Sequence, residues 1–275
     1  MDVRSLAWLG WEKLTGTLAL SADLFVIGRL LDGGMVTSYA LTKRPVDLLV
    51  SLFQRPAIAL SPTVSFLSGS EKSARLGEVV GQAGLRLLWL LGGAALGTLL
   101  LLQPLVSVWV GPAHYLGGHA AWILALALAV SVFSGLFANL YWASGATTNF
   151  CRINSALSAL TVAGILIGLH FFGVTGLMIG ALLPRLLLAT WLFPRLALRA
   201  LKIEGAARRA IWRESVAVGA AFAVGGGVAF ALRHGSDLSV WAQGLAGLAA
   251  YAGALSLGSG ALRREVRALA GGATA

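Results

Sequence analysis

The stretch AGLRLLWLLGGAALGTLLLLQPLVSVWV, residues 83–110, holds one charged residue, Arg86, in 28 positions. A helix needs about 20 consecutive and mostly apolar residues to cross the hydrocarbon of a bilayer. The stretch therefore predicts a membrane-spanning α-helix, and similar runs recur along the chain.

The composition of the whole chain agrees with this prediction. Hydrophobic residues make up 57% of the 275 residues, and 12% are charged. A soluble domain typically carries about 25% charged residues. So few charges cannot cover a water-exposed surface, but they suit a lipid-exposed one. Membrane strands would show short segments of strict alternation, which the chain lacks. We therefore predict an all-α polytopic membrane protein.

The long apolar runs divide the chain into about eight expected transmembrane helices. Turn residues lie between several of them, including Gly33-Gly34, Gly111-Pro112 and Gly173. The second and third helices are long enough to tilt or to extend beyond the hydrocarbon. The expected helices cover residues 6–31, 37–66, 83–110, 119–144, 153–172, 174–193, 214–232 and 239–261.

A basic segment from Pro194 to Glu214 separates the first six expected helices from the last two. The last two are richer in Gly and Ala and carry no charge in their middle. We predict two parts: a six-helix unit in residues 1–200, and a basic cytoplasmic loop with a C-terminal helix pair in residues 201–275.

The Lys and Arg residues predict the orientation of the bundle. With the N-terminus in the cytoplasm, thirteen of them fall in cytoplasmic segments, and the outer loops hold only Arg233. Cytoplasmic loops of membrane proteins carry such an excess. We expect both termini in the cytoplasm, and we interpret the net charge of +10 as an orientation signal and not as a nucleic-acid surface. The thirteen are Arg4, Lys72, Arg75, Arg152, Arg195, Arg199, Lys202, Arg208, Arg209, Arg213, Arg263, Arg264 and Arg267.

Motifs that carry catalytic or metal chemistry are missing from the sequence. One cysteine, Cys151, allows neither an internal disulfide nor a cysteine zinc site. The four histidines do not form the helical pair of a zinc protease. There is no Gly-x-Ser-x-Gly motif, no paired-carboxylate motif and no aspartate-rich loop. We expect no enzyme, no metal and no cofactor.

Charged residues inside the expected spans gather on the second helix. Charge at membrane depth is costly and indicates a functional site by default. At about 100° per residue, five polar residues share one face of this helix. Lipid cannot solvate this face, so it must meet a water-filled cavity or other protein groups. The five are Arg44, Asp47, Ser51, Gln54 and Arg55.

Two interpretations of this polar face remain open. The arginines suit an anionic ligand such as a phosphate, because a guanidinium group offers a planar fork of donors. Asp47 or Asp23 would then be a carboxylate that responds to a proton or a sodium ion. Alternatively, the charges are internal ion pairs that hold the helices together, with Arg29 and Lys43 reaching an interface. Arg185, which follows Pro184, either contacts the cavity or reaches an interface, and the interface is the favoured interpretation.

The stretch SADLFVIGRLLDGGMVTSYALTKRPVDLL, residues 21–49, is followed by PTVSFLSGSEKSARL, residues 62–76. Together they resemble the seventh and eighth helices of polysaccharide-type flippases, a family of the multidrug/oligosaccharidyl-lipid/polysaccharide exporter superfamily. The resemblance covers residues 5–200. The matching positions are Asp23, Ile27, Gly28, Arg29, Gly34, Tyr39, Ala40, Trp109, Gly111, Tyr115, Phe172, Gly173 and Gly176.

The resemblance implies a multi-pass protein of the bacterial inner membrane. It would flip undecaprenyl-linked oligosaccharide or polysaccharide intermediates by alternating access, with coupling to a proton or sodium gradient or to the membrane potential. Arg44, Arg55 and Lys43 would engage the pyrophosphate of the lipid in a central cavity. The sequence matches only the C-terminal lobe of such a transporter. We therefore expect a fragment of a longer protein, or a chain that pairs with another lobe.

The sequence also bears on partners and on alternative functions. Polysaccharide polymerases and glycosyltransferases are implied as partners, besides the lipid-linked substrate and the bilayer; nucleic acid is not. A cation-coupled multidrug exporter would favour an acidic cavity, whereas the polar face here is basic. A membrane enzyme of polysaccharide synthesis would need a larger polar loop. A scaffold that recruits such enzymes through basic inner loops is a further alternative.

Overall fold

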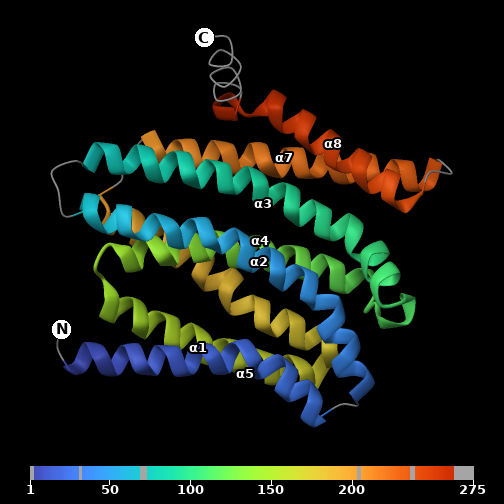
Figure 1. The fold of residues 1–275 in the computed structure, drawn as a ribbon, viewed down its shortest axis with the longest axis horizontal. Coiled ribbons are helices and arrows are strands. Elements are labelled where there is room, and N and C mark those ends of the chain that lie inside the picture. The colour runs from blue at the N-terminus through green and yellow to red at the C-terminus, as the bar shows by residue number, and fades with distance from the viewer. Residues whose placement is uncertain (1–2, 31–32, 69–72, 203–205, 236–238, 263–275) are drawn as a thin grey trace.

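A computed structural model describes residues 3–30, 33–68, 73–202, 206–235 and 239–262, and every statement on the fold concerns these ranges. They form α-helices joined by short turns, and none of them forms a strand (Figure 1). The prediction of an all-α protein is confirmed. The α-helices are α1 Val3–Leu30, α2 Gly33–Ser68, α3 Ser73–Trp109, α4 Gly118–Ala143, α5 Thr147–Pro184, α6 Thr190–Ala200, α7 Ala206–Gly235 and α8 Val240–Gly258.

Four helical stretches of the described chain are long and apolar enough to cross a membrane. They include the expected third, fourth and eighth spans, and one long run contains the expected fifth and sixth. The more highly charged α1 and α2 are not among the four, and the apolar part of α7 is shorter. The four stretches are Val79–Trp109, Gly118–Ala143, Thr147–Ala200 and Val240–Gly258.

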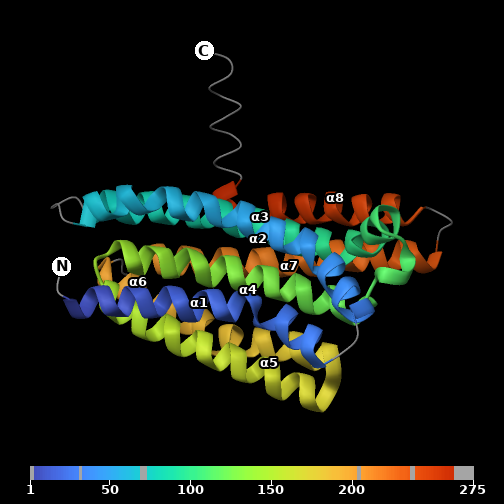
Figure 2. The same ribbon diagram turned by 60° about the horizontal axis from the view of Figure 1, so that its bottom comes forward.

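The run from Thr147 to Ala200 folds back on itself at Gly173, which has a φ of +61°. A residue with a side chain rarely adopts such a φ. Beyond this turn the chain returns antiparallel, so that four glycines meet backbone to backbone in the hairpin at the lower edge of Figure 2. Gly164 faces Gly180, and Gly168 faces Gly176, so these small residues allow the two helical arms to pack closely.

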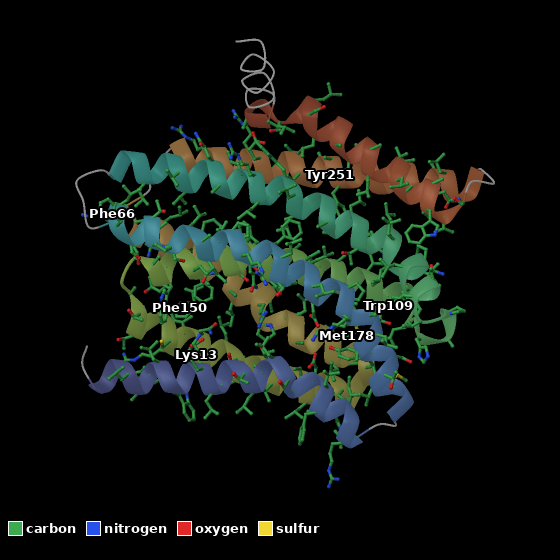
Figure 3. The ribbon with its side chains drawn as sticks, in the orientation of Figure 1. Lys13, Phe66, Trp109, Phe150, Met178 and Tyr251 are labelled. Atoms are coloured by element: carbon green, nitrogen blue, oxygen red, sulfur yellow. The ribbon has the colours of Figure 1, made fainter. Side chains whose placement is uncertain are left out.

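Helices α7 and α8 pack against each other and against α3, on the side of the molecule away from α1 (Figure 1). Tyr251 of α8 (labelled in Figure 3) connects this helix to α3, because its hydroxyl donates a hydrogen bond to the carbonyl of Trp89 at 2.7 Å. Its ring lies over Gly92 and Gly93, where a Cβ would meet the ring.

The basic segment before α7 differs from the expectation of a loop extending to residue 214. Helix α6 ends at Ala200 and α7 already begins at Ala206, so residues 206–213 are helical. Their sequence, AARRAIWR, is rich in Ala and Arg, which are strong helix formers. Residues 194–200 are helical too, as the end of α6, and Leu201 and Lys202 form a turn. Residues 203–205 and the basic residues beyond 262 lie outside the described ranges. The division at residue 200 stays a prediction.

One face of the α1–α2 hairpin is buried in the bundle and the other is open. Ile27 is fully buried, and Tyr39 and Val46 are 3% exposed, within one apolar cluster that also includes residues of α3, α4 and α5. On the open side, Phe25 of α1 and Leu48 of α2 are exposed. This arrangement determines which charged residues of the hairpin meet other protein groups.

Candidate functional site

Asp23 is the centre of a polar contact between α1 and α2. It is 5% exposed. The Tyr39 hydroxyl donates to its Oδ2 at 2.8 Å, and the Lys43 ammonium lies 2.5 Å from the same atom. The backbone N–H of Leu24 donates to Oδ1 at 2.8 Å. Asp23 therefore has both a compensating charge and partners for both of its oxygens, as a buried carboxylate requires.

Lys43 joins this contact to the open side of α2. Its ammonium lies 3.8 Å from Oδ2 of Asp47, one helical turn further along, and over the ring of Tyr39. Asp47 is half exposed. Asp47 therefore pairs with Lys43, four residues earlier on the same helix. Lys43 also departs from the interpretation that it reaches an interface, because its charge is held between two carboxylates.

A pocket of about 160 Å³ lies beside these ion pairs, between α1, α2, α4 and the two arms of α5. Apolar residues such as Met178 form much of its wall (Figure 3). Its charged lining is balanced, with two carboxylates and two cations. These are Asp23, Asp47, Lys43 and Arg185.

Arg185 was interpreted from the sequence as reaching an interface, but the structure places it in this pocket. Its Nη1 donates to Oγ of Ser131 on α4 at 3.4 Å. The residue begins a π-helical turn, Arg185–Ala189, directly after Pro184. Such turns inside α-helices occur often at functional sites, because they redirect side chains. In the sequence, Pro184 indicates a local irregularity of the helix, but it does not predict the direction of the Arg185 side chain.

The predicted polar face of α2 is largely open. Arg44, Asp47, Ser51 and Arg55 are all exposed. In the described part of the chain, no ion pair to Arg44 or Arg55 is found. Their guanidinium groups are therefore available to an anion outside this chain. A guanidinium group within a membrane would require such a partner or water.

Gln54 is the exception on this face, because it turns toward α4. It is half-buried, and a Cβ on Gly135 would lie 3.4 Å from its Nε2. The absence of a side chain at Gly135 thus makes room for the amide. The structure separates the predicted set into an open part with two arginines and a packed part that includes Gln54, Lys43 and Asp23.

Chemically, the two parts suit different tasks. The open arginines can donate bidentate hydrogen bonds to phosphate oxygens. The packed Asp23 and Lys43 already satisfy each other and hold α1 against α2. No family model, curated protein or solved structure matches the chain.

Proposed function

We propose that the chain is one lobe of a transporter that flips lipid-linked oligosaccharides across the bacterial inner membrane by alternating access. The observation that carries the proposal is the position of Arg44 and Arg55 on the open side of α2, where neither forms an ion pair with a carboxylate of the described residues. The pyrophosphate that links a sugar to an isoprenoid lipid is an anion. When such a lipid is flipped, its pyrophosphate crosses the membrane and would pass these arginines.

The proposal includes the wider topology. In the proposed topology, which has eight spans and both termini in the cytoplasm, the open face of α2 lies within the membrane. Lipid tails cannot solvate Arg44, Asp47, Ser51 and Arg55, so a second lobe would cover this face and enclose a watery cavity. Transporters of this general kind bind substrate near the midplane, between two lobes that rock against each other.

The charge distribution favours an anionic substrate over a cationic drug. Lys43 neutralises Asp23 and lies beside Asp47, whereas the two open arginines have no such partner in the described chain. A multidrug exporter that attracts cations would need the opposite arrangement, with free carboxylates toward the cavity. The basic open face supports the lipid-linked pyrophosphate as substrate.

Binding of lipid to the purified chain in nanodiscs tests the proposal. The probes are undecaprenyl pyrophosphate and uncharged undecaprenol, compared by native mass spectrometry. Each charge-assisted hydrogen bond contributes about 1.5–3 kcal/mol, so losing both arginines should weaken pyrophosphate binding by at least about tenfold. The variant is Arg44→Gln with Arg55→Gln. The control is Arg29→Gln, an exposed arginine on α1. Equal binding of both lipids would overturn the proposal.

A further inference from the structure

A second pocket, of about 440 Å³, lies between α3, α4, α7 and α8. Helices α3, α4 and α8 belong to stretches that are long and apolar enough to cross a membrane. None of the described lining residues comes from α1 or α2, so this pocket is separate from the open face with Arg44 and Arg55. Its volume is in the range of about 300–1,000 Å³ that small-molecule sites have.

Helix α7 leaves this space open because small residues form its wall. Ala223, Gly226 and Gly227 line the pocket. A Cβ on Gly227 would meet no atom within 4 Å, and one on Gly226 would have its nearest neighbour at 3.9 Å. The preceding Gly225 differs, because it packs closely against the backbone of α8. Two of the three consecutive glycines therefore border a cavity and are not needed for helix packing.

The polarity of the pocket changes along the helices. Gln103 lies near the C-terminal end of α3 and Gln243 near the N-terminal end of α8, at the end of the bundle with the α3–α4 and α7–α8 turns (Figure 1). Leu99 and Phe222 line the pocket closer to the middle of their helices. A membrane lipid has the same arrangement, with a polar head at the surface and an apolar chain directed toward the middle of the bilayer.

The polar end of the pocket is uncharged. The described lining contains no Asp, Glu, Lys, Arg or His, so a charged head group would be buried without a compensating partner. The side chain of Gln103 is exposed and makes no hydrogen bond to the described chain. An amide group can both donate and accept hydrogen bonds, as hydroxyl and ester groups require. The lining therefore favours an uncharged head with hydroxyl groups.

We propose that this pocket binds an uncharged acylglycerol. Its hydroxyl groups meet Gln103 and Gln243, and its chain lies along the small residues of α7. An acyl chain suits the inner part of the pocket, because apolar cavities do not hold water stably. This lipid is distinct from the pyrophosphate lipid of the proposed function, and the two bind to different helices.

Three related lipids test the proposal by native mass spectrometry of the purified full-length chain in micelles that contain one of them. Monoolein carries two hydroxyl groups, oleoyl lysophosphatidic acid adds a charged phosphate, and methyl oleate keeps the chain and the ester without hydroxyl groups. We expect one saturable monoolein molecule per chain. Methyl oleate, which lacks the hydrogen bonds, should bind about tenfold more weakly. Lysophosphatidic acid should bind more weakly still, because its charge has no partner.

Two kinds of variant locate the lipid. Gly227→Leu should abolish monoolein binding, because its side chain extends into the pocket without colliding with the protein. Gly219→Leu is the matched control: it lies on the same helix outside the described lining, and a Cβ there also meets nothing within 4 Å. Gln103→Leu should reduce the preference for monoolein over methyl oleate severalfold and leave the binding of methyl oleate unchanged.

Several results would overturn the inference. One is a wild type that retains no monoolein, and another is equal retention of monoolein by Gly227→Leu and Gly219→Leu. Equal binding of monoolein and methyl oleate would show that the pocket does not recognise the head. Displacement of monoolein by undecaprenol would show that the pocket takes an isoprenoid chain instead. Monoolein binding without any preference for pyrophosphate lipid would leave this site standing and overturn the proposed function alone.

Discussion

The ammonium of Lys43 lies 2.5 Å from Oδ2 of Asp23, and this contact connects the first two helices across a sequence separation of 20 residues. Because Lys43 also reaches Asp47, one cation serves a buried and an exposed carboxylate. The ion pair therefore acts as a structural link beside the open arginines, rather than as part of the surface that would meet a substrate.

Replacing Lys43 by methionine should destabilise the protein. The change leaves Asp23 buried without a positive partner, and breaking a buried pair in this way costs about 3–5 kcal/mol. Unfolding of the purified chain in detergent, followed by circular dichroism, measures the effect. The double variant Lys43→Met with Asp23→Asn should recover a large part of the loss, because no isolated charge remains. An equal loss in the single and double variants would contradict a role for charge.

Replacing Gly168 by alanine should disrupt the hairpin in α5. A Cβ at this position would collide with the backbone oxygen of Gly176, so the two arms must move apart. Overpacking of this kind costs about 1–3 kcal/mol. Gly219 on α7 is the matched control, because a Cβ there meets nothing within 4 Å. Its alanine variant should be neutral or slightly more stable, as alanine is the better helix former. Equal melting temperatures of the two variants would argue against the glycine contact.

A monomer of this chain should not flip lipid by itself. The open face of α2 is only one wall of the proposed cavity, and alternating access needs a second lobe on the other side. The measurement is translocation of a fluorescent undecaprenyl-pyrophosphate sugar in proteoliposomes that contain the purified chain at a density below one copy per vesicle. Rapid translocation under these conditions would show that the six-helix unit and its helix pair are sufficient alone.

On the charged face of α2, helical periodicity predicted the exposure of most residues correctly, but not of all. Helical periodicity placed Arg44, Ser51 and Arg55 on one side, and the structure leaves all three exposed. The same periodicity also placed Gln54 there, but the absence of a side chain at Gly135 lets its amide turn toward α4. Periodicity describes the direction of a residue from its own helix, and it contains no information on the neighbouring helix.

For the same reason, the sequence did not predict which side chains of different helices contact each other. Arg185 meets Ser131, 54 residues away, and Glu12 meets Asn154, 142 residues away. Neither contact follows from spacing, because each depends on how far one helix is shifted along another. The π-helical turn after Pro184 adds a local rotation that no average helix geometry would include.

The sequence by itself determined that this chain is a bundle of apolar helices, because hydrophobicity, helix length and turn residues are local properties. It also determined that several charges, including Asp23, Arg44 and Arg55, lie within helical segments and not in the short connecting turns. Tertiary structure alone decided which charges neutralise each other. Lys43 pairs with two carboxylates, Arg44 and Arg55 are exposed, and Oε2 of Glu12 has no hydrogen-bond partner among the described residues. The physical reason is that electrostatic pairing acts over a few ångströms, and only packing brings side chains from distant segments that close.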